Sequence, residues 1–173
     1  MAGFSESGID LDFTSGTWFR FQESEPYSSV SGFGFKEMDA CYLEIRQDGS
    51  KVFYAIELKD FTEAESLTED TMSKRIWNIV KKNVDTLQMF LSARYQHSFG
   101  KALEREKNID LHTGLSKVFF LTIVNVKPEN ALMVQALKDK CLGKLCAYSK
   151  VWDGISFTLM TKEQAQKRYT FVK

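Results

Sequence analysis

The sequence lacks the features that mark several classes of protein. No apolar run approaches the roughly 18 residues of a membrane-spanning helix, and the N-terminus MAGFSESGIDLDF has neither the basic nor the apolar region of a signal peptide. The three cysteines, Cys41, Cys141 and Cys146, have no C-x-x-C spacing, and no histidine lies near the last two. Neither a disulfide framework nor a zinc site is therefore indicated. We expect a cytoplasmic protein without a membrane partner.

An excess of charge of one sign is also absent. The 23 basic residues balance 23 acidic residues, which argues against a protein that coats nucleic acid through positive charge alone. A local basic patch stays compatible with this balance. Because no repeat period and no long linker appear in the 173 residues, we expect residues 1–173 to form a single domain with its own core.

Hydrophobic periodicity and turn residues predict alternating strands and helices. Loops are expected at 1–8 and 28–34, which are small and polar. Segments with alternating or continuous apolar character are expected to be strands, namely 17–22, 39–45, 51–58, 117–126 and 154–160. The run at 117–126 is nearly unbroken, which is typical of a central strand that is buried on both faces.

The helices expected from the sequence are one long, one intermediate and one short segment. The long helix has an apolar stripe at spacings of three and four, a capping box at Ser66–Glu69 and a stop at Gly100. Its stripe consists of Met72, Ile76, Ile79, Val80, Val84, Leu87, Leu91 and Tyr95. A second helix is expected over 128–142, closed by Gly143, and a short one from Thr161. The order of elements predicts an α/β or α+β fold.

The segment FYAIELKDF, residues 53–61, carries Glu57 and Lys59 within an apolar strand. Because side chains alternate along a strand, both project from the same side. A three-residue hairpin loop, 47–49, would place Asp39 opposite Glu57, whereas a two-residue Asp48-Gly49 loop would place polar Glu44 beside Phe53. We prefer the first register because it gives one face that is apolar until its open end.

Two carboxylates in this register would repel each other unless a cation lies between them. A divalent ion with oxygen ligands suits the pair, and a neighbouring ammonium can hold a phosphate oxygen or a water molecule. This arrangement fits phosphodiester hydrolysis, in which the ion and the lysine stabilise charge on the transition state. The alternative is a strand end that reaches solvent, with Glu57 and Lys59 as a surface salt bridge.

Asp39 followed by Glu57-Leu58-Lys59 resembles the motif of the PD-(D/E)XK nuclease superfamily. The resemblance spans roughly residues 36–126 and implies a restriction-endonuclease-like α-β-β-β-α-β core with a mixed central sheet flanked by helices. It also implies that Asp39, Glu57 and the carbonyl of Leu58 ligate Mg²⁺ or Mn²⁺, and that Lys59 positions the attacking water. Many members carry a polar residue on the following helix, for which Gln88 and Lys81 are the candidates.

Other candidate residues come with plainer alternatives. A glutamate on an N-terminal helix is common in the superfamily, and Glu23 and Glu25 are candidates, although Pro26 argues against a helix through Glu25. Polar residues of the long helix could contact a phosphate backbone or form a solvated face. They are Lys74, Arg75, Lys81, Lys82 and Gln88. The three tryptophans are expected in the core or an interface, and His97 and His112 are isolated in the sequence.

The sequence therefore predicts a Mg²⁺-dependent nuclease that acts on DNA ahead of RNA. Its partner would be nucleic acid, and a homodimer or larger complex is left open. The alternative is a catalytically inactive domain of the same fold that binds protein or nucleic acid. Net neutrality favours this alternative, as does the missing N-terminal glutamate.

Overall fold

The hairpin at Asp48-Gly49 forms the centre of a mixed five-stranded sheet in the computed structural model, which describes residues 2–63 and 69–173. The strands lie in the order β3-β4-β5-β6-β7. Their bounds are β3 Gly16–Phe19, β4 Ala40–Ile45, β5 Lys51–Asp60, β6 Leu115–Asn125 and β7 Ile155–Thr161. The first three strands are antiparallel neighbours, and β6 and β7 continue parallel to β5. The fold is thus mixed α/β, as predicted.

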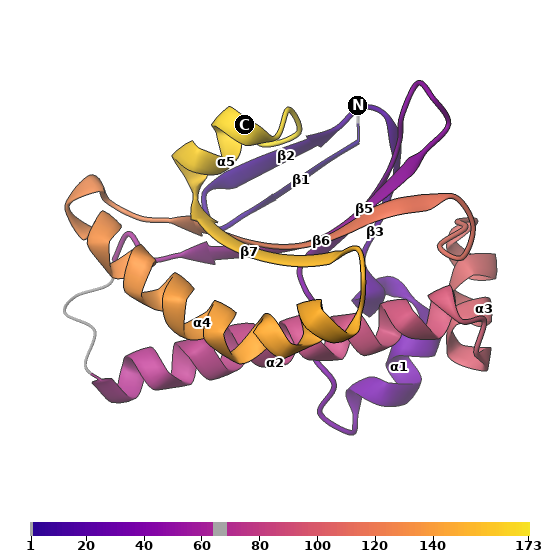
Figure 1. The fold of residues 1–173 in the computed structure, drawn as a ribbon, viewed down its shortest axis with the longest axis horizontal. Coiled ribbons are helices and arrows are strands. Elements are labelled where there is room, and N and C mark those ends of the chain that lie inside the picture. Colours follow the sequence, from indigo (N-terminus) through magenta and orange to yellow (C-terminus); the bar gives the residue numbers. More distant parts are fainter. Residues whose placement is uncertain (1, 64–68) are drawn as a thin grey trace.

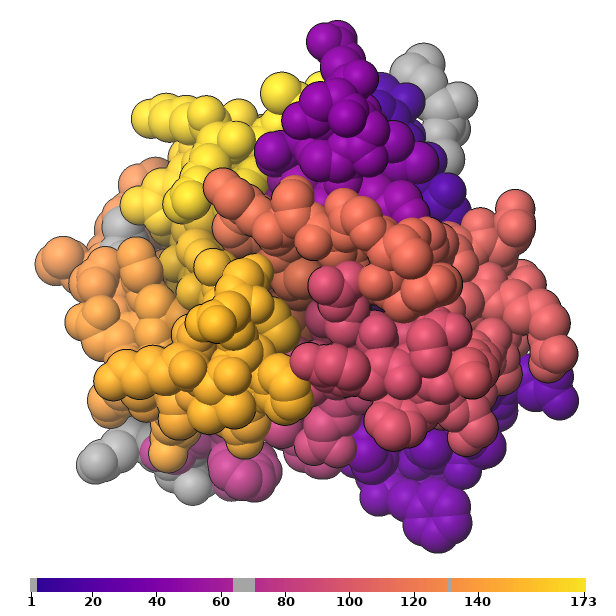
Figure 2. All heavy atoms as spheres, turned by 45° about the vertical axis from the view of Figure 1, so that its right-hand side comes forward, coloured from indigo at the N-terminus to yellow at the C-terminus, as the bar shows by residue number. Residues whose placement is uncertain are grey.

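Helices cover one face of this sheet (Figure 1). They are α1 Glu25–Ser31, α2 Glu69–Arg94, α3 Ser98–Lys107 and α4 Ala131–Val151. The apolar stripe of α2 is confirmed for Ile76, Ile79, Val80 and Leu87, which are buried, but not for Tyr95, which lies beyond the end of α2 and is exposed. Met72, Val84 and Leu91 are partly buried. Figure 2 shows the C-terminal parts of α2 (pink) and α4 (orange to yellow) side by side on the surface. Through α2 and α3 the chain crosses from β5 to the parallel strand β6.

A hairpin and a short helix cover the other face of the sheet (Figure 1). The hairpin consists of β1 Ala2–Glu6 and β2 Ile9–Phe13, and the helix is α5 Lys162–Arg168 with Thr161 as its N-cap. The loop predicted for residues 1–8 was therefore wrong. Ser7 and Gly8 form a tight turn with positive φ angles of 56° and 70°, as two-residue hairpin loops require.

Several predicted helix ends were also wrong. Gly100 does not stop the long helix but lies buried inside α3, where its Cα lies against Ala93 of α2. α4 continues through Gly143 to Val151. α1 occupies part of the expected loop at 28–34, because Pro26 lies in the first turn, where a helix needs no amide hydrogen bond.

The capping box predicted at Ser66–Glu69 falls largely outside the described residues. The strand expected at 17–22 ends at Phe19 and is followed by a 3₁₀ turn at Phe21–Glu23, and a second such turn, Pro128–Asn130, precedes α4. Of the helices in the described ranges, none combines the length and apolar character that crossing a membrane requires.

Candidate active site

The hairpin register brings Asp39 and Glu57 to neighbouring positions on adjacent strands. Ala40 pairs with Ile56, and Leu43 pairs with Phe53, as the three-residue loop predicted. The main-chain N–H of Arg46 donates to the carbonyl of Ser50 at 2.9 Å. Gly49 has a φ angle of 80°, the left-handed conformation that this loop needs. Extending the register by one residue places Asp39 beside Glu57.

Both carboxylates face the helical layer. Phe53 and Ala55 pack in one cluster with Leu87 of α2, and the alternation along β5 turns Glu57 toward the same helix. Glu57 is fully buried and Asp39 is 6% exposed. The interpretation of Glu57 and Lys59 as a surface salt bridge is therefore wrong for Glu57, whose charge is shielded from water.

Lys82 joins the two carboxylates. Its Nζ lies 2.9 Å from Asp39 Oδ1 and 2.9 Å from Glu57 Oε2. The interpretation of the polar residues of the long helix as a solvated face is therefore wrong for Lys82. Helical periodicity predicts Lys82 on the polar side of α2. Its long side chain nevertheless extends beneath the helix, so that its ammonium lies between two carboxylates of the sheet. No local pattern in the sequence indicates this contact, because Asp39 and Lys82 are 43 positions apart.

The second ammonium of the cluster belongs to Lys59. It forms an ion pair with Glu57 Oε1, and its side chain is 27% exposed. The cluster thus contains two carboxylates and two ammonium groups, Asp39, Glu57, Lys59 and Lys82. The formal charge of the cluster is zero, and Lys59 and Lys82 are more exposed than the two carboxylates.

Burial dominates the electrostatics of Glu57. It raises the pKa of Glu57 to about 7, the charge of Asp39 adds to the rise, and Lys59 and Lys82 oppose it. Burial alone would lower the pKa of Lys82, but the charges and hydrogen bonds of Glu57 and Asp39 outweigh it and leave the pKa above its ordinary value. Glu57 is therefore poised to change its protonation near neutral pH, while Lys82 stays charged.

The residues predicted as metal ligands converge in part. Asp39 Oδ1 and Glu57 Oε2 point at one position, now held by the ammonium of Lys82. The other oxygen of Asp39 accepts a hydrogen bond from the N–H of Leu58 at 2.7 Å, which fixes the carboxylate orientation. The carbonyl of Leu58 accepts a 3.3 Å hydrogen bond from the hydroxyl of Ser7. Two carboxylates aimed at one cation position fit a divalent ion, and the Leu58 carbonyl would have to exchange its serine partner to join them.

The other residues predicted on α2 lie elsewhere. Lys81 forms an ion pair with Asp85 at 2.7 Å, and Gln88 is exposed. Lys74 is exposed as well. Neither Lys81 nor Gln88 is the helix residue that faces the carboxylates, since Lys82 takes that place. The prediction for those two residues was therefore wrong by one position for Lys81 and by about two turns for Gln88.

The candidates for an N-terminal acidic ligand lie next to α3. The carbonyl of Glu23 accepts a hydrogen bond from Lys107, and the main-chain N–H of Glu25 donates to Glu106 at 2.9 Å. α1 begins at Glu25, so a helix through this residue exists despite Pro26. Its contacts nevertheless point to α3.

A second group of potential ligands was missed in the sequence. Single ligand atoms of Glu104, Asp110 and His112 lie within 4.8 Å of one another, so His112 is not isolated in space. All four carboxylate oxygens already accept hydrogen bonds, for example from Gln96 at 2.6 Å and Lys51 at 2.7 Å. These bonds tie the loop before β6 to α3 and β5, which is a structural role.

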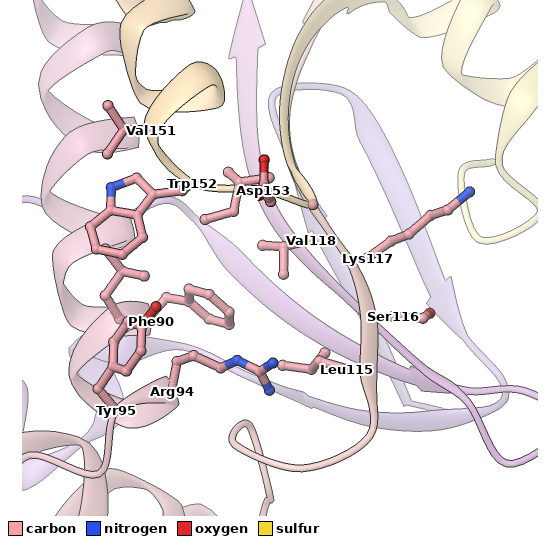
Figure 3. Close-up of a pocket in the computed structure, with 13 residues that line it drawn as sticks. Phe90, Arg94, Tyr95, Leu115, Ser116, Lys117, Val118, Val151, Trp152 and Asp153 are labelled. Atoms are coloured by element: carbon pink, nitrogen blue, oxygen red, sulfur yellow. The ribbon is translucent and has the colours of Figure 1, made fainter.

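A pocket of about 330 Å³ opens at the other end of the sheet (Figure 3). Phe90, Tyr95 and Trp152 line it, and Arg94 extends across its floor toward Leu115. Leu115 pairs with the start of β5, whereas Glu57 pairs with Thr122 near the end of β6. This pocket is therefore separate from the carboxylates.

The candidate site therefore rests on its own geometry. Comparison with protein-family models, curated proteins and solved structures yields no match for this chain.

Proposed function

We propose that this chain is a Mg²⁺- or Mn²⁺-dependent nuclease that hydrolyses phosphodiester bonds and prefers DNA to RNA as its substrate. One observation carries the proposal. Asp39 Oδ1 and Glu57 Oε2, from neighbouring strands, lie at the same distance of 2.9 Å from a single cationic atom. Carboxylates so placed hold one cation, and a divalent ion is the cation that phosphodiester hydrolysis uses.

Each residue of the cluster has a role in this proposal. Asp39 and Glu57 would hold the ion, and the hydrogen bond from Leu58 N–H keeps Asp39 in the required orientation. The ion would supply charge stabilisation and an acidified water molecule. Lys59 lies at the exposed edge of the cluster, where its ammonium can orient a water molecule or a phosphate oxygen. Lys82 keeps the two carboxylates together when no other cation is bound.

The chain order supports a restriction-endonuclease-like core in part. Three antiparallel strands, β3 to β5, precede helices α2 and α3 and the parallel strand β6. Apart from the additional helix α3, this is the order β-β-β-α-β that the superfamily resemblance implies. Helix α1 differs, because it lies between β3 and β4 in the chain instead of before the three strands. The core proposed here therefore has its first helix inserted within the meander.

A cleavage assay tests the proposal. The wild-type chain would be incubated with labelled single- and double-stranded DNA and RNA in Mg²⁺ or Mn²⁺. We expect cleavage that EDTA and the substitution Asp39→Asn both abolish, while Lys101→Ala, at an exposed position of α3, retains it. Wild-type protein that cleaves none of these substrates, or that cleaves equally well in EDTA, would contradict the assignment.

A second candidate function is supported by the charge balance of the cluster. Two ammonium groups neutralise two carboxylates, so the cluster is electrically complete without a metal. A non-catalytic domain that binds protein or nucleic acid would need nothing more. Calorimetric titration with Mn²⁺ separates the two functions, because only the nuclease should show binding that Glu57→Gln removes.

A further inference from the structure

A groove runs between α2 and α4 on the outer surface of the helical layer. It consists of two adjoining pockets of about 300 and about 340 Å³. Ser73 and Lys140 line the first, Lys81 and Tyr148 line the second, and Trp77 and Lys144 line both. Because two residues are shared, the pockets form one continuous surface, called here the α2–α4 groove.

Trp77 is the central aromatic residue of this groove. The sequence predicted a core or interface position, but 64% of the residue is exposed. Ile76 and Val80, next to it on α2, are buried in the core below. The indole therefore contributes little to the core and presents an apolar ring to solvent. Such a ring on a rigid helix is a platform on which a flat, unsaturated group can stack.

The rim of the groove is positively charged. Lys140 and Lys144 are exposed on successive turns of α4, and in the described part of the chain neither ammonium has a carboxylate within ion-pair distance. Lys81 and Asp85 neutralise each other. In a chain of zero net charge, two unneutralised ammonium groups beside an exposed indole are a local basic excess.

The groove adjoins the segment that leads to the carboxylates. Lys36 donates from its side chain to Asn78 at 2.7 Å and from its main chain to Asp85 at 2.9 Å. Asn78 follows Trp77 on α2, and Asp39 is three residues beyond Lys36. Lys36 thus ties the segment that leads to Asp39 to the part of α2 that carries Trp77.

We propose that the α2–α4 groove binds a single-stranded segment of nucleic acid, with one base stacked on Trp77 and adjacent phosphates contacting Lys140 and Lys144. The proposal rests on the proposed function, for which it names the form of the substrate. A base can stack on the indole only when it is unpaired, which disfavours a duplex. A single strand of nucleic acid supplies both bases that can stack and regularly spaced phosphate charges, whereas an acidic peptide supplies negative charge without bases.

Binding is measured under conditions in which the strand is not cleaved. Fluorescence anisotropy of a labelled oligothymidylate would be measured with the full chain in EDTA, with a duplex and polyglutamate as competitors. We expect Trp77→Ala to weaken binding roughly 5- to 150-fold, the range that loss of one stacked base produces. Trp77→Phe, which retains a ring, should recover most of the affinity. Phe33→Ala removes another exposed aromatic residue, 87% exposed, and should leave binding unchanged.

The lysines are tested through the salt dependence. Lys140→Ala combined with Lys144→Ala should lower the slope of log affinity against log salt by about 1.4, since each phosphate contact on a single strand contributes about 0.7. Lys101→Ala should leave the slope unchanged. The proposal is overturned if wild type does not bind, if Trp77→Ala binds as wild type does, or if duplex or polyglutamate competes as well as the single strand.

The binding assay and the cleavage assay can fail independently of each other. Binding in EDTA that depends on Trp77, without cleavage in Mg²⁺ or Mn²⁺, would remove the proposed catalysis and leave the groove assignment standing. Cleavage by a Trp77→Ala chain with unchanged affinity would do the reverse.

Discussion

Replacing Lys82 by methionine tests the central ion cluster most directly. The change keeps the length of the side chain and removes its ammonium, leaving Asp39 and Glu57 close together with Lys59 as the remaining cation. Glu57 is fully buried, and the Lys82 side chain is 21% exposed. Removing one partner of a buried ion pair costs about 3–5 kcal/mol.

The expected loss is smaller than that range because Lys82 is partly hydrated and Lys59 still pairs with Glu57. We expect Lys82→Met to lower the free energy of unfolding by about 2–3 kcal/mol at pH 8, or the melting temperature by roughly 4–12 °C for a chain of this size. At lower pH the loss should shrink, since Glu57 can then bind a proton: its pKa is about 7 with Lys82 present, and removal of the Lys82 charge raises this pKa further.

Thermal unfolding with and without Mn²⁺ provides the assay. A divalent ion should take the place of the missing ammonium, so Mn²⁺ should raise the melting temperature of Lys82→Met more than that of wild type. Lys101→Met, at an exposed position, serves as the control for loss of one positive charge. If Lys82→Met is as stable as wild type at pH 8, the ion pairs of Lys82 do not stabilise the fold. If stability falls and Mn²⁺ restores none of it, the metal site is refuted.

Three further predictions concern activity, pH and packing. Lys59→Ala should lower cleavage by about 10²–10³-fold with the fold intact, because a single charge contact to a transition state has about this effect; equal turnover by variant and wild type would remove its role. The free energy of unfolding should fall as the pH rises from about 4.5 to about 7, because Glu57 keeps its proton in the folded chain and releases it in the unfolded chain. Denaturant titrations should show this decline disappearing in Glu57→Gln, and a decline of equal size in both proteins would contradict the assignment. Gly100→Ala should lower the free energy of unfolding by about 1–3 kcal/mol, because the added methyl group overlaps with Ala93. Gly143→Ala has open space around it and should raise the free energy of unfolding by up to about 1 kcal/mol. If chemical denaturation ranks the two variants the other way, α3 does not pack on α2 as described.

The sequence by itself determined the register of the central hairpin. The left-handed conformation at Gly49 and the alternation of apolar residues in 39–45 and 51–58 are local properties, and together they leave one register with a coherent face. The neighbouring placement of Asp39 and Glu57 follows from that register. The stripe of α2 was equally local, because burial of one helical face requires apolar residues at spacings of three and four.

Helix ends were decided by packing. A glycine after an apolar stripe is a common stop signal, yet Gly100 is needed for the close approach of α3 to Ala93. The long helix ends at Arg94 and is followed by Gln96 in a left-handed conformation, with a φ angle of 58°. In the sequence, a glycine that allows two helices to approach closely looks the same as a glycine that ends a helix. Only the position of the second helix distinguishes the two.

The role of Lys82 was decided by the tertiary structure alone. Periodicity separates apolar from polar positions, but it cannot separate a solvated polar residue from one whose partners arrive from elsewhere in the chain. On α2, Thr86 and Asp85 are buried because the main chain at Met38 and Lys36 donates to them. Lys82 reaches Asp39 and Glu57 for the same reason. The sequence determined where the two carboxylates meet, and only the packing of α2 on the sheet decided which cation lies between them.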